Sequence, residues 1–120
     1  MGLRWEIDRR KSLVTITAEG QISRAEVEAL LDDILKDEVL PLAKLVDCSM
    51  GIPAMPLEDL LAIGMRIKES PTRSAGALAI LRPQNTEPMA RLLGILATLP
   101  RPMKIFRALP AAMRWLEARA

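Results

Sequence analysis

The spacing of apolar residues along this chain switches between a period of two and a period of about 3.6, and this alternation constrains its fold most strongly. Residues 3–8 and 12–20 alternate apolar and polar side chains, as half-buried strands do, and Arg9-Arg10-Lys11 supplies the turn of a β-hairpin. Ser23 and Glu26 then form the pattern of a capping box. Apolar residues follow at i, i+3, i+4, i+7 and i+8 from Val27, which predicts an amphipathic helix.

Three further strand–helix pairs are predicted after this helix. The strands are expected at 43–48, 77–82 and 103–107, and the helices at 56–69, 87–99 and 109–119. The order ββαβαβαβα predicts an α/β fold with a mixed sheet of about five strands and about four helices, parallel after the opening hairpin. Because there is neither a long linker nor a repeat, we expect residues 1–120 to form a single domain.

The chain contains no histidine, which excludes Ser-His-Asp and Cys-His catalytic arrangements and the usual zinc sites. Its glycines are scattered and form no phosphate-binding loop. We therefore expect a protein that is not an enzyme and that carries no metal or other cofactor.

The single cysteine, Cys48, leaves no internal disulfide and fits a reducing compartment. No run approaches the roughly 20 apolar residues of a membrane span. Residues 1–11 also lack the apolar stretch of a signal peptide. These features predict a cytoplasmic protein.

The net charge of +2 conceals an asymmetry between the two halves of the chain. Residues 1–60 carry seven Lys and Arg against twelve Asp and Glu, and residues 61–120 carry ten against three. Either the two halves mix their charges within one domain, or a basic face meets an anionic partner. The basic residues occur mostly singly and aromatic residues are few, so no nucleic-acid partner is expected.

The predicted helices 56–69 and 87–99 are apolar over about 200° of their circumference, twice what packing on a sheet requires. Either they pack against each other as well as on the sheet, or they face a second copy of the chain, an apolar ligand or a membrane surface. Gly64 and Gly94 lie in the middle of these helices, where each glycine lowers helix stability by about 1 kcal/mol relative to Ala. A close approach of the two helices would explain both glycines.

The stretch "LVDCSMGIPAMPLED", residues 45–59, passes from a strand through a proline-containing loop into a helix. Asp47 ends its strand where open α/β folds bind ligands, or else it caps backbone amides of the loop. Cys48 is interpreted as a small buried side chain rather than a thiolate. Met50 and Met55 provide adaptable apolar surface or else close the core, and Arg82 leaves the neighbouring strand at the same edge.

These residues and the apolar helix faces define one candidate ligand site between helices 56–69 and 87–99 and the 50–57 loop. Its expected members are Asp47, Met50, Met55, Leu57, Leu61, Arg82, Met89 and Leu93.

The order of elements resembles the STAS superfamily (sulfate transporter and anti-sigma-factor antagonist domains), in particular its SpoIIAA-like branch of small bacterial proteins. The resemblance is carried by "WEIDRRKSLVTITAEGQIS", "SRAEVEALLDDIL", "KLVDCS" and "PMKIFRALPAAMRWLEA", and it covers nearly the whole chain. It implies the STAS fold and, for this branch, an ability to bind hydrophobic ligands and approach membranes.

The resemblance also implies a phosphorylation motif, which this chain lacks. Anti-sigma-factor antagonists carry Asp-Ser-Ser-Gly at the start of the second helix, with a serine that the partner kinase phosphorylates. Here that place reads Met55-Pro56-Leu57-Glu58, without a hydroxyl group. Asp47-Cys48-Ser49 lies too early, at the end of the strand, so Ser49 remains only an alternative phosphorylation site.

The sequence therefore predicts a non-catalytic bacterial STAS-like module that binds a small apolar or amphipathic ligand, with peripheral membrane contact as an accompanying hypothesis. The alternative is a protein-interaction or homodimerisation module that uses helices 56–69 and 87–99.

Overall fold

A computed structural model describes residues 2–70 and 75–119 of the chain. Its elements follow the predicted order ββαβαβαβα, and the expected α/β fold is confirmed. They are β1 (Gly2–Asp8), β2 (Leu13–Ile22), α1 (Arg24–Ile34), β3 (Ala43–Pro53), α2 (Leu57–Glu69), β4 (Leu78–Leu81), α3 (Glu87–Ala97), β5 (Met103–Phe106) and α4 (Leu109–Ala118).

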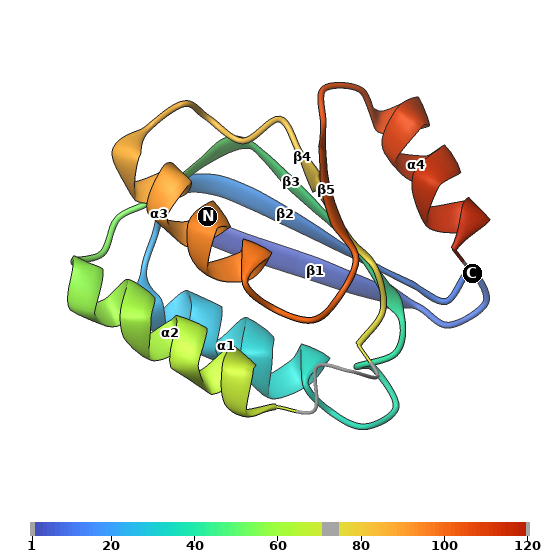
Figure 1. The fold of residues 1–120 in the computed structure, drawn as a ribbon, viewed down its shortest axis with the longest axis horizontal. Coiled ribbons are helices and arrows are strands. Elements are labelled where there is room, and N and C mark those ends of the chain that lie inside the picture. The colour runs from blue at the N-terminus through green and yellow to red at the C-terminus, as the bar shows by residue number, and fades with distance from the viewer. Residues whose placement is uncertain (1, 71–74, 120) are drawn as a thin grey trace.

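The strands form one mixed five-stranded sheet in the order β1-β2-β3-β4-β5 (Figure 1). β1 and β2 are an antiparallel hairpin in which Trp5 lies opposite Ile16. The remaining neighbours are parallel, with Val46 of β3 between Ile16 and Ile80. Each parallel connection passes through a helix, as right-handed crossovers require.

The first helix begins as its sequence predicts. The Ser23 side chain accepts a hydrogen bond from the Glu26 backbone N–H, and the Glu26 carboxylate accepts one from the Ser23 N–H. Thr86 caps α3 with its side-chain oxygen, which accepts a hydrogen bond from the N–H of Met89. α2 follows Pro56 and has no side-chain cap, but Glu58 and Asp59 lie favourably in its first turn.

β3 continues to Pro53, beyond the predicted end at residue 48, and corrects the expected 50–57 loop. The longer strand exists because β2 also extends, to Ile22, and offers it a partner. Between the pairs Thr17–Asp47 and Glu19–Met50, β3 contains one more residue than β2, which is a β-bulge. The bulge reverses the alternation of side chains, so that Met50 points away from the face that Cys48 occupies.

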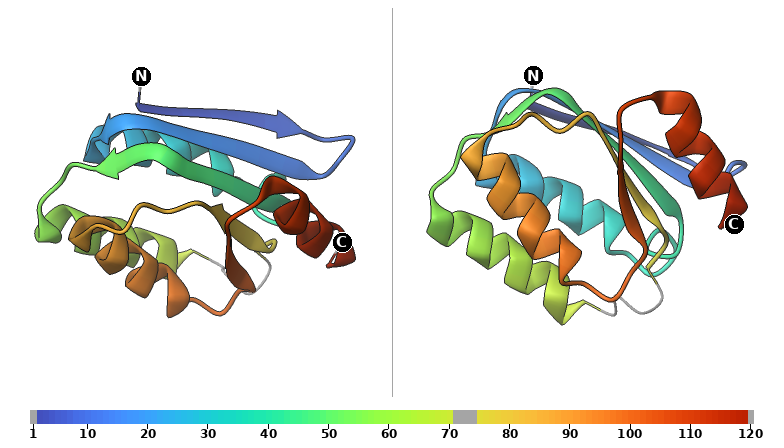
Figure 2. Two further views of the ribbon diagram at one scale, coloured as in Figure 1. Left: turned by 90° about the horizontal axis from the view of Figure 1, so that it is seen from above. Right: turned by 45° about the horizontal axis from the view of Figure 1, so that its top comes forward.

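The helices are divided unequally between the two faces of the sheet (Figure 2). α4 covers one face, where Ala112 and Leu116 pack with Leu45, Ala79 and Phe106. α1 and α3 approach the other face. α2 packs on α1 and α3 and makes no comparably close approach to any strand, so it lies outermost in this layer.

The wide apolar arc of α2 is divided between the interior and the surface. Ile63 and Ile67 are buried among α1 and α3, which confirms that the helices pack against each other. Gly64 permits the close approach, because a Cβ atom there would stand 2.5 Å from Cγ2 of Ile95. Gly94 does not: nothing described lies within 4 Å of a Cβ at that position, which corrects the sequence-based expectation.

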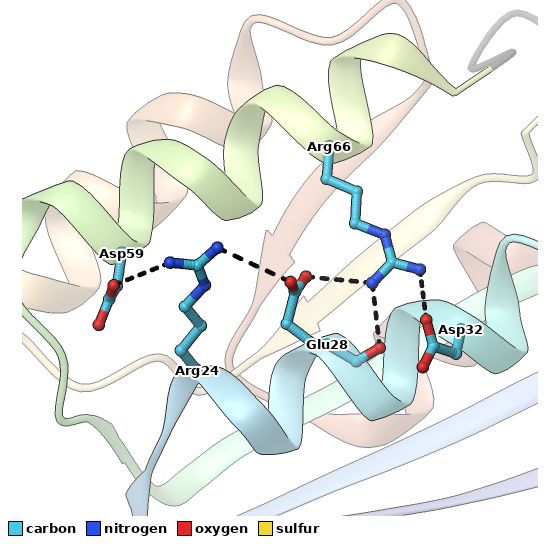
Figure 3. Close-up of polar contacts among 5 residues, drawn as sticks. All are labelled: Arg24, Glu28, Asp32, Asp59 and Arg66. Atoms are coloured by element: carbon cyan, nitrogen blue, oxygen red, sulfur yellow. Dashed lines mark hydrogen bonds and ion pairs between the residues drawn. The ribbon is translucent and has the colours of Figure 1, made fainter.

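α2 is also connected to α1, by ion pairs (Figure 3). Arg66 Nη1 donates to Glu28 Oε1 at 3.1 Å, and its Nη2 lies 2.5 Å from Asp32 Oδ1. Arg24 reaches in the other direction, to Asp59 at 3.1 Å. Both arginines of α1 and α2 are therefore engaged in ion pairs between the two helices.

Candidate functional site

An apolar cavity of about 160 Å³ lies between the sheet and the layer formed by α1, α2 and α3. The β2 and β3 strands supply its floor, α1 and α3 its walls, and Ile63 and Ile67 of α2 its roof. The described lining residues are Leu3, Ile16, Ala18, Ile22, Val27, Leu30, Leu31, Ile34, Leu35, Lys44, Val46, Cys48, Gly51, Pro53, Met55, Ile63, Ile67, Leu78, Ile80, Met89, Leu92, Leu93, Leu96 and Arg101.

Small side chains on the floor explain where the space arises. Ala18, Cys48 and Gly51 lie on adjacent strands and fill little of the volume above the sheet. Gly51 faces the cavity only because the bulge in β3 reverses the alternation, and a Cβ there would collide with Ala18 at 2.4 Å. The helices do not collapse into this gap, because α2 rests on α1 and α3 rather than on the strands.

Asp47 and Cys48 have local roles at this bulge. Asp47 Oδ1 accepts a hydrogen bond from the Ser49 N–H at 3.0 Å, which satisfies a backbone group at the bulge. Cys48 is buried, and its burial, with the nearby charge of Asp47, raises the pKa of the thiol to about 11. The thiol is therefore protonated at neutral pH and is a poor nucleophile.

Lys44 is the one buried charged residue among those described, at 1% exposure. It precedes Val46 and Cys48 on the inward face of β3, and its Nζ donates to the carbonyl oxygens of Val39, Leu40 and Leu42 at 2.6–2.8 Å. Burial lowers the pKa of Lys44 to about 7, and the positive charge of Arg101 acts in the same direction. The ammonium group thus fixes the segment between α1 and β3.

Arg101 lines the same end of the cavity, from the segment that precedes β5. Its Nη2 donates to the carbonyl oxygen of Gly76, whereas its Nε has no hydrogen-bond partner among the described atoms. Burial lowers the pKa of Arg101 to about 10. A buried, unsatisfied charged donor costs more than 1 kcal/mol, which makes this group unusual in a folded protein.

The sequence analysis did not single out Lys44 or Arg101. Lys44 did leave a signal, because strand alternation in "AKLVDC" places it on the same face as the apolar Val46. Arg101 lies between two prolines outside any regular element, and nothing in its spacing indicates that it faces the interior.

The structure separates the predicted site residues into two groups. Met55, Met89 and Leu93 line the cavity. The others lie elsewhere: Met50 (67% exposed), Leu57 (46%), Leu61 (51%), Arg82 and Asp47. Arg82 adopts a φ of 51° and donates from Nε to the Arg107 carbonyl oxygen at 3.1 Å, and is thus directed along the sheet edge.

Leu57 belongs to a second, shallower hollow of about 320 Å³ between the first turns of α2 and α3. Met55, Leu60, Pro88 and the Glu87–Arg91 ion pair, 2.5 Å apart, complete its lining. Ser49 lies apart from this hollow, half-buried in β3, where its carbonyl oxygen accepts a hydrogen bond from Gln84.

Two absences apply to residues 2–70 and 75–119. No helix there is both long enough and apolar enough to cross a bilayer. No group of acidic or cysteine side chains in the same ranges is arranged to hold a metal ion.

A mixed five-stranded sheet with this element order defines the SpoIIAA-like fold of the STAS class, as the resemblance implied. One similar solved structure is an uncharacterised protein of the DUF3478 family with a SpoIIAA-like fold from Shewanella loihica, with 20% identity and a TM-score of 0.64. The match covers 96% of this chain and 94% of that one.

A second similar structure is the anti-sigma factor antagonist SpoIIAA in its unphosphorylated form, with 12% identity and a TM-score of 0.60. It covers 97% of this chain and 98% of that protein. At these identities the likeness establishes the fold alone. No family model and no curated protein matches the sequence.

Proposed function

We propose that this protein is a non-catalytic module that binds a small apolar ligand in the cavity between the sheet and α1, α2 and α3. The observation that carries the proposal is the cavity itself, whose lining is almost entirely aliphatic. Its volume of about 160 Å³ is close to that of an engineered cavity of about 150 Å³ that stays dry and binds benzene or xenon.

The composition of the lining favours binding over catalysis. A water molecule needs two to four polar partners, and the aliphatic side chains on most of this surface offer none. The thiol of Cys48 is protonated at neutral pH, because its pKa is raised to about 11, and the three donors of Lys44 are already bound to carbonyl oxygens. An apolar guest gains dispersion contacts without displacing well-bound water.

The test is a titration with decanol, a neutral probe, followed in the amide NMR spectrum. We expect saturable shifts at the floor and roof of the cavity, around Ala18, Cys48 and Ile63. Leu93→Trp adds volume to the wall and should abolish these shifts. Leu61→Trp is the matched control, since Leu61 is exposed on the same helix layer and does not line the cavity.

The proposal fails if decanol gives no saturable shifts in the unmodified protein. It also fails if Leu93→Trp binds decanol as well as Leu61→Trp does, because binding would then occur at the surface.

A second candidate function is protein interaction through the outer face of α2. Leu57, Leu61 and Met65 recur at i, i+4 and i+8 and are 46%, 51% and 61% exposed. An exposed apolar stripe of this kind is typical of a docking surface for a second copy, a protein partner or a membrane.

Light scattering after size-exclusion chromatography distinguishes these kinds of partner. A dimer that Leu61→Glu dissociates supports self-association. A monomer that sediments with anionic vesicles until Leu61→Glu is introduced supports membrane contact.

A further inference from the structure

The charge of the cavity lining is one-sided. Lys44 and Arg101 are its charged residues, and no Asp or Glu is among the described residues that line it. Both cations lie at the amino-terminal ends of β3 and β5, while the opposite end, near Gly51 and Met55, is apolar. The cavity is therefore apolar along its length and positive at one end.

Lys44, whose lowered pKa of about 7 leaves it partly protonated at neutral pH, contributes some positive charge but no free donor. An ammonium group has three N–H donors, and all three are used by the carbonyl oxygens of Val39, Leu40 and Leu42. Its effect on a guest is accordingly long-range, a positive potential in a surrounding of low polarity.

Arg101 offers what Lys44 does not. Its Nε–H is buried and has no partner in the described part of the chain, and of its two Nη2 hydrogens the Gly76 carbonyl needs one. Nε and Nη2 share one edge of the planar guanidinium group, the edge that commonly pairs with the two oxygens of a carboxylate.

We propose that the ligand is an amphiphile with a carboxylate head, a fatty acid or a similar aliphatic acid, whose carboxylate pairs with the Nε–Nη2 edge of Arg101. This inference rests on the proposed function, since it names the class of ligand for the same cavity. One negative charge supplies the missing hydrogen-bond partner of the buried Nε atom and offsets the positive charge at this end of the cavity.

The residues that line the cavity lie along β3 from Lys44 to Gly51, a length of roughly 20 Å at about 3.3 Å per residue. This line of residues gives the direction in which a chain would extend from the head. The aliphatic tail runs along the strands beneath α2, between Ile63 and Cys48, toward Met55. A phosphate head would bring more oxygens than the single free edge of Arg101 can satisfy, so the carboxylate is the better match.

The experiment compares decanoate, decanol and decylamine at neutral pH by calorimetric titration, below their micelle concentrations. Their tails are alike and only the head differs in charge. We expect decanoate to bind about tenfold or more tightly than decanol, as a charge-assisted hydrogen bond implies, and decylamine to bind most weakly. This series needs no variant, so it does not depend on the folding of a mutant.

Arg101→Gln removes the charge and should bring decanoate to the affinity of decanol, while decanol itself binds as before. Arg114→Gln is the matched control, because Arg114 is exposed on α4, on the other face of the sheet. It should leave the preference for decanoate unchanged.

The outcomes separate the two proposals. If decanol and decanoate bind the unmodified protein equally, or if the preference survives Arg101→Gln, the carboxylate inference is overturned while the apolar site stands. If none of the three probes binds, the proposed function fails and this inference fails with it.

Discussion

Ile95 of α3 packs against the backbone of Gly64 of α2, so closely that a Cβ atom on Gly64 would lie 2.5 Å from Cγ2 of Ile95. This contact brings the two helices together on the side of α2 opposite its ion pairs with α1. α2 is held from both sides over the cavity by one apolar contact and one set of charged contacts.

Gly64→Ala should therefore destabilise the protein despite the higher helix propensity of alanine. Cγ2 is bonded directly to Cβ of Ile95, and isoleucine in a helix has one strongly preferred χ1 rotamer, so this atom cannot move aside easily. Overpacking of about 1–3 kcal/mol exceeds the propensity gain of about 1 kcal/mol. Urea unfolding should show a net loss of about 1 kcal/mol.

Gly94→Ala provides the matched control for this prediction. Gly94 is also within a helix, but nothing described lies within 4 Å of a Cβ there, so the propensity gain is unopposed. The free energy of unfolding should rise by up to about 1 kcal/mol. Equal effects of the two substitutions would contradict the close contact between α2 and α3.

Lys44 should make the protein more stable as the pH rises from 7. Its pKa is lowered to about 7 in the folded state, whereas an unfolded lysine has a pKa of about 10.4. Between these values the unfolded state holds more protons, so the free energy of unfolding increases with pH, by at most about 1.4 kcal/mol per unit. Chemical denaturation at pH 7, 7.5, 8 and 8.5, roughly, measures this slope.

The thiol of Cys48 works in the opposite direction above about pH 8.5, the ordinary pKa of cysteine. Its pKa of about 11 in the folded state means that the folded protein then holds the additional proton, and rising pH destabilises it. Lys44→Met should abolish the rise above pH 7, and Cys48→Ala should extend it toward pH 10. A flat profile in the unmodified protein would show that Lys44 keeps its proton.

Cys48 should react slowly with iodoacetamide in the folded protein. At pH 8 the difference between a pKa of about 11 and one of about 8.5 lowers the thiolate fraction roughly 200-fold, and burial lowers access further. Alkylation followed by mass spectrometry, with and without urea, checks this. Comparable rates in the two conditions would place the thiol at the surface.

Arg66→Gln should lower the free energy of unfolding by about 0.5–1 kcal/mol, because Arg66 joins Glu28 and Asp32 of α1 through partly exposed ion pairs. The loss should shrink in about 1 M salt, where such pairs are screened. Lys68→Gln is the control, an exposed cation on the same helix without an ion pair among the described residues. If both variants lose the same stability at both salt concentrations, these pairs contribute nothing.

The pattern of apolar residues was sufficient to predict the element order, the capping box at Ser23 and the parallel sheet. These features depend on neighbours within a few residues, and the sequence displays those neighbours directly. The pairing partner of residues 49–53 is β2, roughly 30 residues earlier in the chain. This pairing makes residues 49–53 a strand, although their local propensity favours a loop. The bulge that turns Met50 outward and Gly51 inward depends on the same distant pairing.

The candidate site shows the same division. Met55, Met89 and Leu93 were placed near one another because apolar helix faces must be buried somewhere, which periodicity reveals. Lys44 and Arg101, the cations of the cavity, were not predicted as site residues. The inward position of Arg101 follows from the path of the chain between α3 and β5.

The sequence by itself determined the α/β class, the order of strands and helices, and the lack of any histidine-dependent chemistry, because composition and periodicity are local properties. Only the tertiary structure decided that α2 rests on α1 and α3 above the sheet and that an apolar space with a positive end remains beneath it. Cavities and buried charges depend on how elements that are distant in the sequence pack together, because that packing decides which spaces stay unfilled and which charges stay unpaired. No single stretch of sequence contains this information.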